Sequence, residues 1–297
     1  MHNHNHSHNE NEDSKRIALA FFLNVAFTII EFIGGLLTNS TAIMADAVHD
    51  LGDSLSIGSA WLLARWGRKS ADSEFTYGYR RLTLFGAFIN SVVLIAGSLW
   101  VLSEAIPRLG NPVMPVTEGM LALAILGITV NGIAAYRLSK GSTLNEKVLN
   151  WHLLEDVLGW LAVLVVAVVL MFADWPILDP LLSVGFTLFI LFNVIRNLWI
   201  TGKLFLQAVP DRALHDEIRN ALLDIDGILD IHHQHLWSLD GEHHVLTAHI
   251  VVGGDFDADE YGAMKNATAE ALEQFGLAHT TIEIELKDEF CRDKTKQ

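Results

Sequence analysis

Cysteine is almost absent from this sequence: Cys291 is the only one among 297 residues. An intramolecular disulfide framework is therefore excluded, and a lone thiol fits a reducing environment for the C-terminal tail. Residues 1–13 contain no apolar run, so we expect no signal peptide there. The GxxxxGK[ST] loop of ATP-hydrolysing proteins and the HExxH motif of zinc proteases are also missing. Their absence argues against ATP-driven work and against a protease of that type.

Basic residues are outnumbered, with 20 Lys and Arg against 35 Asp and Glu and a formal net charge of −15. Residues 208–297 hold 19 acidic and 7 basic residues, which gives −12 for this segment alone. A segment so acidic argues against nucleic acid as a partner and favours cations or water as its neighbours.

Apolar residues are abundant, at 51% of the chain, and they are concentrated between residues 17 and 200. A bilayer core of about 30 Å requires about 20 apolar residues in a helix. Six stretches qualify: Ile17–Leu37, Ala42–Leu63, Leu82–Ala105, Val116–Tyr136, Val148–Phe172 and Ile177–Ile200. Turn material separates them, including the segment from Pro107 to Pro115. The sequence therefore predicts a six-helix transmembrane bundle over residues 15–205.

The basic residues near the span ends fall almost entirely on one side of the predicted membrane. That side carries Lys15, Arg16, Arg65, Arg68, Lys69, Arg80, Arg81, Arg137, Lys140, Lys147, Arg196 and Lys203. The other side has Arg108. We therefore expect a multi-pass membrane protein with both termini, and the acidic tail with them, in the cytoplasm.

The second span carries four ionisable residues, Asp46, His49, Asp50 and Asp53. Charged groups inside a membrane are costly unless they line a cavity or bind something, so each one suggests a function. At about 100° per residue the four occupy about one third of the helix circumference, and His49 lies one turn before Asp53.

The fifth span repeats this pattern, because His152 and Asp156 again stand four residues apart, with Glu155 between them. Two helices that each offer one imidazole and one carboxylate can supply four ligands, a set that suits tetrahedral zinc. His49 and His152 are also the only histidines in the predicted spans. The pattern predicts a metal site made of His49, Asp53, His152 and Asp156, whereas the role of Glu155 stays open.

The segment after Pro210 reads as a soluble α+β domain, which we place at residues 206–290, followed by a tail at 291–297. Periodicity predicts a helix at Ala213–Leu223, strands at Ile228–Leu239 and His243–Val252, a helix at Asp257–Phe275 and a strand at Thr280–Leu286. Asp240-Gly241 is typical of a two-residue hairpin turn. A turn centred there sets His232 opposite His249, close enough to share a metal ion.

Other metal-binding groups in the sequence are less constrained. Residues 1–14 form a histidine-rich tail in which four histidines alternate with Asn and Ser, a pattern that favours a native metal-binding segment over an affinity tag. We interpret His233, His235, His243 and His244 mostly as solvated strand residues. Cys291 is an accessory ligand or incidental.

The segments STAIMADAVHDLGD, at residues 40–53, and HLLED, at residues 152–156, together resemble the paired HxxxD signature of the zinc-selective cation diffusion facilitators. YGYRR, at residues 77–81, and IHHQHLWSL, at residues 231–239, are similar to that family as well. The resemblance implies a homodimer that works by alternating access, with His49, Asp53, His152 and Asp156 as transport site. It also implies a ferredoxin-like, metallochaperone-type cytoplasmic domain.

Relatives of that family bind regulatory zinc at positions corresponding to His232, His249 and Glu285, with Glu283 and His235 here as further candidates. The expected function is Zn²⁺ efflux in exchange for protons, in a lipid bilayer and without enzymatic activity. Two alternatives stay open: a membrane metalloenzyme that uses zinc-bound water, and a zinc sensor that does not transport.

Overall fold

The computed structural model describes residues 22–291 apart from residue 23, residue 68, residues 140–143 and residues 254–256. The histidine-rich segment 1–14 and the tail 292–297 lie outside this part. The chain divides into two compact units, one made of residues up to 63 with residues 86–198 and the other of residues 64–85 with residues 199–297. Each unit is described by itself.

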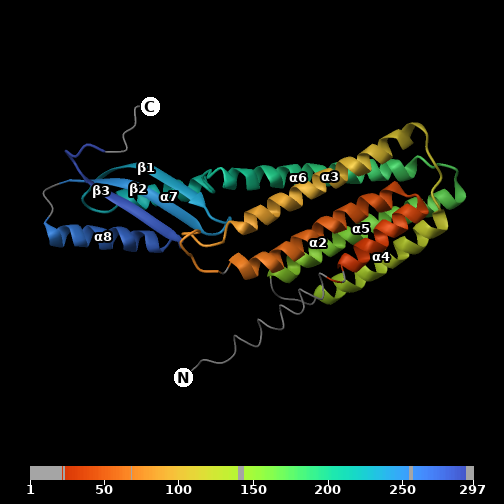
Figure 1. Ribbon diagram of the computed structural model, residues 1–297, viewed down its shortest axis with the longest axis horizontal. Coiled ribbons are helices and arrows are strands. Elements are labelled where there is room, and N and C mark those ends of the chain that lie inside the picture. The colour runs from red at the N-terminus through yellow and green to blue at the C-terminus, as the bar shows by residue number, and fades with distance from the viewer. Residues whose placement is uncertain (1–21, 23, 68, 140–143, 254–256, 292–297) are drawn as a thin grey trace, which may run out of the picture. The chain divides into compact units, whose positions relative to one another are not determined.

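The first unit is a bundle of long helices (Figure 1). A helical segment at Asn24–Thr38 is followed by α2 (Thr41–Gly67), α3 (Leu82–Gly110), α4 (Thr117–Leu138), α5 (Leu144–Phe172) and α6 (Leu178–Phe205). Each of the six predicted spans thus overlaps a helix among the described residues, and residues 17–21 and 23 of the first span lie outside them. The predicted turn from Pro107 to Pro115 was wrong in its first residues, because α3 continues through Pro107 to Gly110. The pyrrolidine ring of Pro107 lies in the last turn of α3, where it disrupts few backbone hydrogen bonds of the helix. The Asn111 amide still donates to the Pro107 carbonyl.

The outer surface of the bundle is apolar. Phe172, Phe192 and Trp199 are each more than 60% exposed, a pattern that suits lipid rather than water. Among the described residues, four stretches are long and apolar enough to cross a membrane: Leu82–Gly110, Thr117–Tyr136, Leu153–Phe172 and Leu178–Phe205. α2 carries the buried acidic residues, which lower its hydropathy. The protein therefore has the membrane bundle that the sequence predicted.

The second unit contains the predicted α+β domain. Its elements are α7 (Arg212–Leu223), β1 (Ile228–Ser238), β2 (His244–Val252), α8 (Ala258–Glu273) and β3 (His279–Leu286). Side chains cap the helices, since Asp211 accepts from the Ala213 amide and Asp257 forms a capping box with Glu260. The strand order is β1-β2-β3, antiparallel between β1 and β2 and parallel between β2 and β3. This is the α+β domain that the sequence predicted, in the ferredoxin-like arrangement that the family resemblance implied.

One face of the sheet forms the core of this domain. Ile218 and Leu222 of α7 and Met264 of α8 pack in one cluster with Ile231 and Ile250 of the strands. Because side chains alternate along a strand, His249, Glu283 and Glu285 point to the opposite face. That face lies outside the apolar core and can therefore hold polar and metal-binding side chains.

The hairpin between β1 and β2 differs from the prediction in its turn. The Leu239 amide donates to the His243 carbonyl across a three-residue loop, and Ser238 pairs with His244. The loop is wider than two residues because Asp240 Oδ1 accepts from the amides of Glu242 and His243. A register shift between His232 and His235 then compensates, so that His232 pairs with His249 as predicted.

Residues 69–81, which connect α2 to α3, pack within this second unit. The ring of Tyr77 meets His279 edge to face at 5.5 Å, and Arg80 Nη1 lies 3.8 Å from Asp240 Oδ2. Hydrogen bonds from the Phe75 amide, the Tyr79 hydroxyl and Lys69 hold the pKa of Asp72 well below its usual range. The connection is therefore an ordered part of the domain.

Candidate metal centres

The helical bundle brings together three of the four residues that the paired motif predicted. His49 Nε2 lies 3.7 Å from Asp53 Oδ2 on the next turn of α2 and 3.8 Å from Asp156 Oδ1 on α5. One ligand atom from each of the three lies within 4.8 Å of the others. We call His49, Asp53 and Asp156 the bundle site.

These spacings nearly fit a metal ion. Two donors on one tetrahedral zinc are about 3.3 Å apart, because each bond is about 2.0 Å long. The three donor atoms lie within 4.8 Å of one another, so binding of one ion would draw them closer together. The three side chains are 10–24% exposed, so water and ions can reach them. The edge of the His49 ring rests against Phe186 of α6, at a centroid distance of 5.8 Å.

The fourth predicted ligand, His152, has its side chain outside the described part of the structure. Its backbone belongs to α5, one turn before Asp156, so it starts from the same face of the helix. Glu155, whose role the sequence left open, has an exposed side chain. It is not part of the bundle site, although it immediately precedes Asp156.

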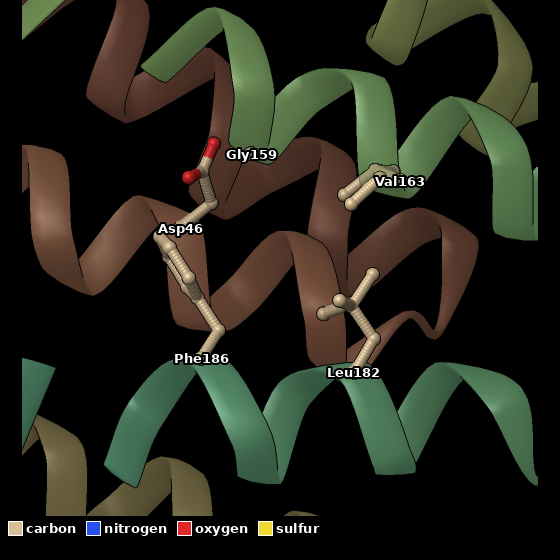
Figure 2. A pocket seen from close by; sticks show the side chains of 7 residues that line it. Asp46, Gly159, Val163, Leu182 and Phe186 are labelled. Carbon is tan, nitrogen blue, oxygen red and sulfur yellow. The ribbon is translucent and has the colours of Figure 1, made fainter. Parts of the chain in front are cut away.

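Two more carboxylates lie buried beside the bundle site. Asp50 is 5% exposed and Asp46, one turn before it, is 3% exposed. Figure 2 shows the Asp46 carboxylate pointing towards Gly159 of α5. Asp46 lines a cavity of about 40 Å³ between α2, α5 and α6, whose other walls are apolar. A cavity of this volume can hold a water molecule, which a carboxylate can bind.

The sequence argument overlooked a buried carboxylate in the first span. Glu31 is 0% exposed and lies in the helical segment Asn24–Thr38, near Asp50. The same rule that singled out the acidic residues of the second span, namely the cost of a charge in an apolar run, could have found it. Three acidic residues, Glu31, Asp46 and Asp50, are thus buried near the bundle site without belonging to it.

The start of α2 is fixed by a carboxylate from another helix. Asp179 of α6 is 1% exposed and accepts hydrogen bonds from the Ser40 hydroxyl at 2.5 Å and the Ala42 amide at 3.3 Å. Ser183 of α6 donates to the Thr41 carbonyl at 2.9 Å. These contacts set the position of α2, and therefore of His49 and Asp53, relative to α6.

A second group of metal-binding side chains lies on the open face of the sheet. His232, His249, Glu285 and Cys291 each offer one ligand atom, and these atoms all lie within 4.8 Å of one another. Glu285 joins the two imidazoles, with Oε1 at 2.7 Å from His249 Nδ1 and Oε2 at 3.1 Å from His232 Nε2. We call these four residues the sheet site.

The electrostatics of the sheet site favour a charged carboxylate. Burial acts to raise the pKa of Glu285, but hydrogen bonds with Cys291 and His249 and the nearby His232 ring hold it below the ordinary value of 4.5. Cys291 Sγ lies 3.6 Å from His249 Nδ1, so the thiol belongs to the group rather than being incidental. The site offers two nitrogen donors, one oxygen and one sulfur, a set typical of zinc and softer metals.

Glu283 and His235, the two further ligand candidates from the sequence, lie outside the sheet site for different reasons. Glu283 pairs with His249 across the parallel strands, and its Oε2 lies 3.6 Å from His249 Nε2. Nδ1 of the His249 ring faces Glu285, and Nε2 on the other side of the ring faces Glu283. Glu283 can therefore orient the ring through Nε2 without binding a metal itself. His235 is exposed and pairs with Thr247, away from Glu285.

Comparison with known proteins places the chain in a family. Residues 17–206 match the family profile described as cation efflux transmembrane domain, and residues 210–287 match the cation efflux protein, cytoplasmic domain. The chain belongs to the cation efflux family.

Relatives over nearly the full length carry metal-transport names. The chain is 32% identical to the cadmium, cobalt and zinc/H(+)-K(+) antiporter of Bacillus subtilis, covering 92% of this chain and 89% of that protein. It is 30% identical to zinc transporter ZitB of Escherichia coli K12, covering 92% and 88%. It is 31% identical to the metal cation efflux system protein CzcD of Cupriavidus metallidurans, covering 92% and 86%.

Proposed function

We propose that this protein exports Zn²⁺ from the cytoplasm in exchange for protons, with His49, Asp53, His152 and Asp156 as the transport site. The observation that carries the proposal is the convergence of His49, Asp53 and Asp156 from two helices of an apolar bundle. Such a group is costly in a membrane unless it serves an ion. The names of the relatives support divalent cation efflux coupled to an opposing cation.

Zinc export is coupled to proton entry because Zn²⁺ and protons compete for the same ligand atoms. A metal ion needs a neutral imidazole and an ionised carboxylate, so protons and Zn²⁺ exclude each other at the bundle site. Movement of helix groups around a fixed site would expose it to one side and then to the other. An ion released outside leaves donors that take up protons, which the return movement carries in.

The bundle's charge distribution supports an orientation for this cycle. The excess of basic residues at one side of the spans favours cytoplasmic termini, and hence a cytoplasmic α+β domain in a bacterial inner membrane. We propose a homodimer in which the sheet site senses zinc. The C-terminal segments of two protomers, residues 208–297 with a formal charge of −12 each, repel each other, and bound cations would relieve that repulsion.

The test is zinc flux into sealed vesicles that contain the purified protein. Asp156→Ala removes one bundle-site donor and should abolish uptake, whereas Glu155→Ala changes the preceding, exposed residue and should retain it. Thermal unfolding of both variants in detergent establishes that they are folded. Parental flux by a folded Asp156→Ala variant would refute the transport site.

The pH gradient separates the proposed antiport from its alternatives. Uptake driven by an outward proton gradient, and absent with a potassium gradient alone, supports Zn²⁺/H⁺ exchange. A sensor or a metalloenzyme would bind zinc but give no flux under either gradient. No hydrolytic activity is expected, since the two HxxxD pairs already fill the four positions of a tetrahedral ion and leave none for an activated water.

A further inference from the structure

His233 sits in a backbone conformation that few residues adopt. Its φ is 49°, in the left-handed region, where a side chain other than glycine is uncommon. The cause is the bulge in β1, where His233 and Gln234 together stand opposite Ala248 of β2. Strained positions of this kind persist when the surrounding structure requires them, and they cluster at functional sites.

The bulge places the imidazole of His233, as well as that of His232, beside His249. Between the turn and the bulge, the pairing of His235 with Thr247 defines a register that, continued, would set His233 opposite His249. Beyond the bulge the register shifts by one residue and sets His232 opposite His249 instead. Neighbours in a regular strand point to opposite faces. At this bulge, however, both rings lie beside His249.

The three rings have the spacing of ligands on one ion. Ring centroids are 5.4 Å apart for His232 and His249, 5.1 Å for His233 and His249, and 5.3 Å for His232 and His233. Two imidazoles bound to a tetrahedral zinc have centroids about 5 Å apart, given Zn–N bonds of about 2.0 Å and angles of about 109°. All three pairs of centroids meet this condition, whereas the ligand atoms that lie within 4.8 Å of one another belong to His232, His249, Glu285 and Cys291, so the ring of His233 would turn to bind the ion.

We propose that His233 is a third imidazole ligand of the sheet site, so that zinc is held by His232, His233, His249 and Glu285. Cys291 is then the alternative fourth donor, which a softer ion such as Cd²⁺ recruits in place of His233. The site thus changes its donor set with the metal. This inference rests on the proposed metal-sensing role of the sheet site.

The chemistry of the ligand atoms explains why Cys291 replaces His233 when the metal changes. The site has five donors for the four positions of a tetrahedral ion, and imidazole suits zinc, whereas thiolate binds softer ions more strongly. His232 and His233 lie at the half-exposed side, while Glu285 and Cys291 are 4% and 7% exposed. An ion that prefers sulfur therefore sits deeper, next to Cys291, and leaves the ring of His233 unbound.

The test uses the full-length chain in detergent with the bundle site disabled by Asp156→Ala. In this background His233→Gly, Cys291→Ser and the neighbouring His235→Ala are compared, together with a His232→Ala/His249→Ala double variant. Glycine is chosen at position 233 because it removes the imidazole and also relieves the left-handed backbone. Zinc and cadmium affinities are measured by chelator competition, and the stability of the metal-free protein by thermal unfolding.

For His233→Gly we expect zinc affinity to fall at least about tenfold, because loss of even an indirect partner of a metal ligand costs that much. Its metal-free melting temperature should equal or exceed that of the parent. Cys291→Ser should bind zinc within about threefold of the parent but lose at least about tenfold in cadmium affinity, with loss of the thiolate-to-cadmium absorbance. His235→Ala should match the parent for both ions.

Two results would overturn the inference. One is a His233→Gly variant that binds zinc like the parent while the double variant loses one zinc, which would leave the sheet site in place without His233. The other is a Cys291→Ser variant that loses as much zinc affinity as His233→Gly. Unchanged zinc stoichiometry in the double variant would instead remove the sheet site itself, and with it the proposed sensing role.

Discussion

Asp179 Oδ2 accepts two hydrogen bonds of 2.8 Å from Thr41, one from its backbone amide and one from its hydroxyl. A carboxylate of α6 therefore caps α2 together with Ser40, whose hydroxyl accepts from the Ile43 amide in the usual way. His49 lies eight residues further along, about 12 Å up the helix axis. Any rotation of α2 that turns His49 must carry α6 along or break this cap.

Asp179→Asn should weaken that connection. The amide keeps the size of the side chain but loses the charge and turns an NH₂ group towards donors, at a cost of about 2 kcal/mol in the free energy of unfolding. We expect a lower melting temperature in detergent and reduced zinc flux with zinc binding at the bundle site retained. Ser183→Ala, which removes one hydrogen bond to Thr41, is the control and should cost about 1 kcal/mol. Parental stability of Asp179→Asn would show that α2 does not depend on this cap.

His49→Asp should change which metal the protein prefers. The substitution keeps the one-turn spacing to Asp53 but replaces a nitrogen donor by oxygen, and carboxylates suit manganese better than imidazole does. We expect the ratio of zinc to manganese flux in proteoliposomes to fall rather than all flux to vanish. Equal ratios for the variant and the parent, measured in the same vesicles, would show that His49 does not bind the transported ion.

Gly127→Ala should disturb the packing of α4 against α5. A Cβ atom at position 127 would overlap the indole ring of Trp160, which is completely buried one turn beyond Asp156. Overpacking of this kind costs about 1–3 kcal/mol. Gly132→Ala on the same helix is the matched control, because nothing lies within 4 Å of its added Cβ. It should be neutral or stabilise the protein by up to about 1 kcal/mol. Equal melting temperatures for the two variants would contradict this account.

Zinc binding at the sheet site should weaken as the pH falls from 7 to 5. Glu285 is not the cause, because its pKa lies below the ordinary 4.5 and its carboxylate stays ionised over this range. Imidazole must be neutral to bind a metal, and free histidine titrates near pH 6.5, so protons displace zinc there. Titration of the Asp156→Ala protein with zinc at pH 7, 6, 5 and 4 measures the effect. Glu285→Gln should lower the affinity at every pH without moving the midpoint, whereas a midpoint below pH 4.5 would assign the proton competition to the carboxylate.

The sequence predicted the bundle, and it singled out three residues that the structure brings together in the bundle site, because both predictions depend on strong local signals. Long apolar runs allow few structures, and a histidine and an aspartate one turn apart within such a run can be recognised without knowing the helix packing. Asp179 could not be assigned in this way. Its role depends on which helix end it meets, and no local pattern specifies that the start of α2 lies beside α6.

The sheet site was predicted in part, and the reason lies in the hairpin. His232 and His249 were paired from an assumed two-residue turn, yet the loop has three residues and the bulge restores the pairing. Turn chemistry is readable from Asp240-Gly241, but whether Asp240 widens the loop depends on its hydrogen bonds. The bulge does not change the alternation of apolar residues in the sequence. The sequence therefore did not predict that His233 lies close to His249.

The bulge in β1 has a consequence for how such a chain can change over generations. If residue 233 were deleted, Gln234 would stand opposite Ala248 and His232 would still stand opposite His249, now without the bulge between them. A single-codon insertion at this point is therefore enough to add an imidazole beside the pair without disturbing that pair. The number of histidines around the ion can vary by one among descendants of a common ancestor while the fold of the domain stays the same.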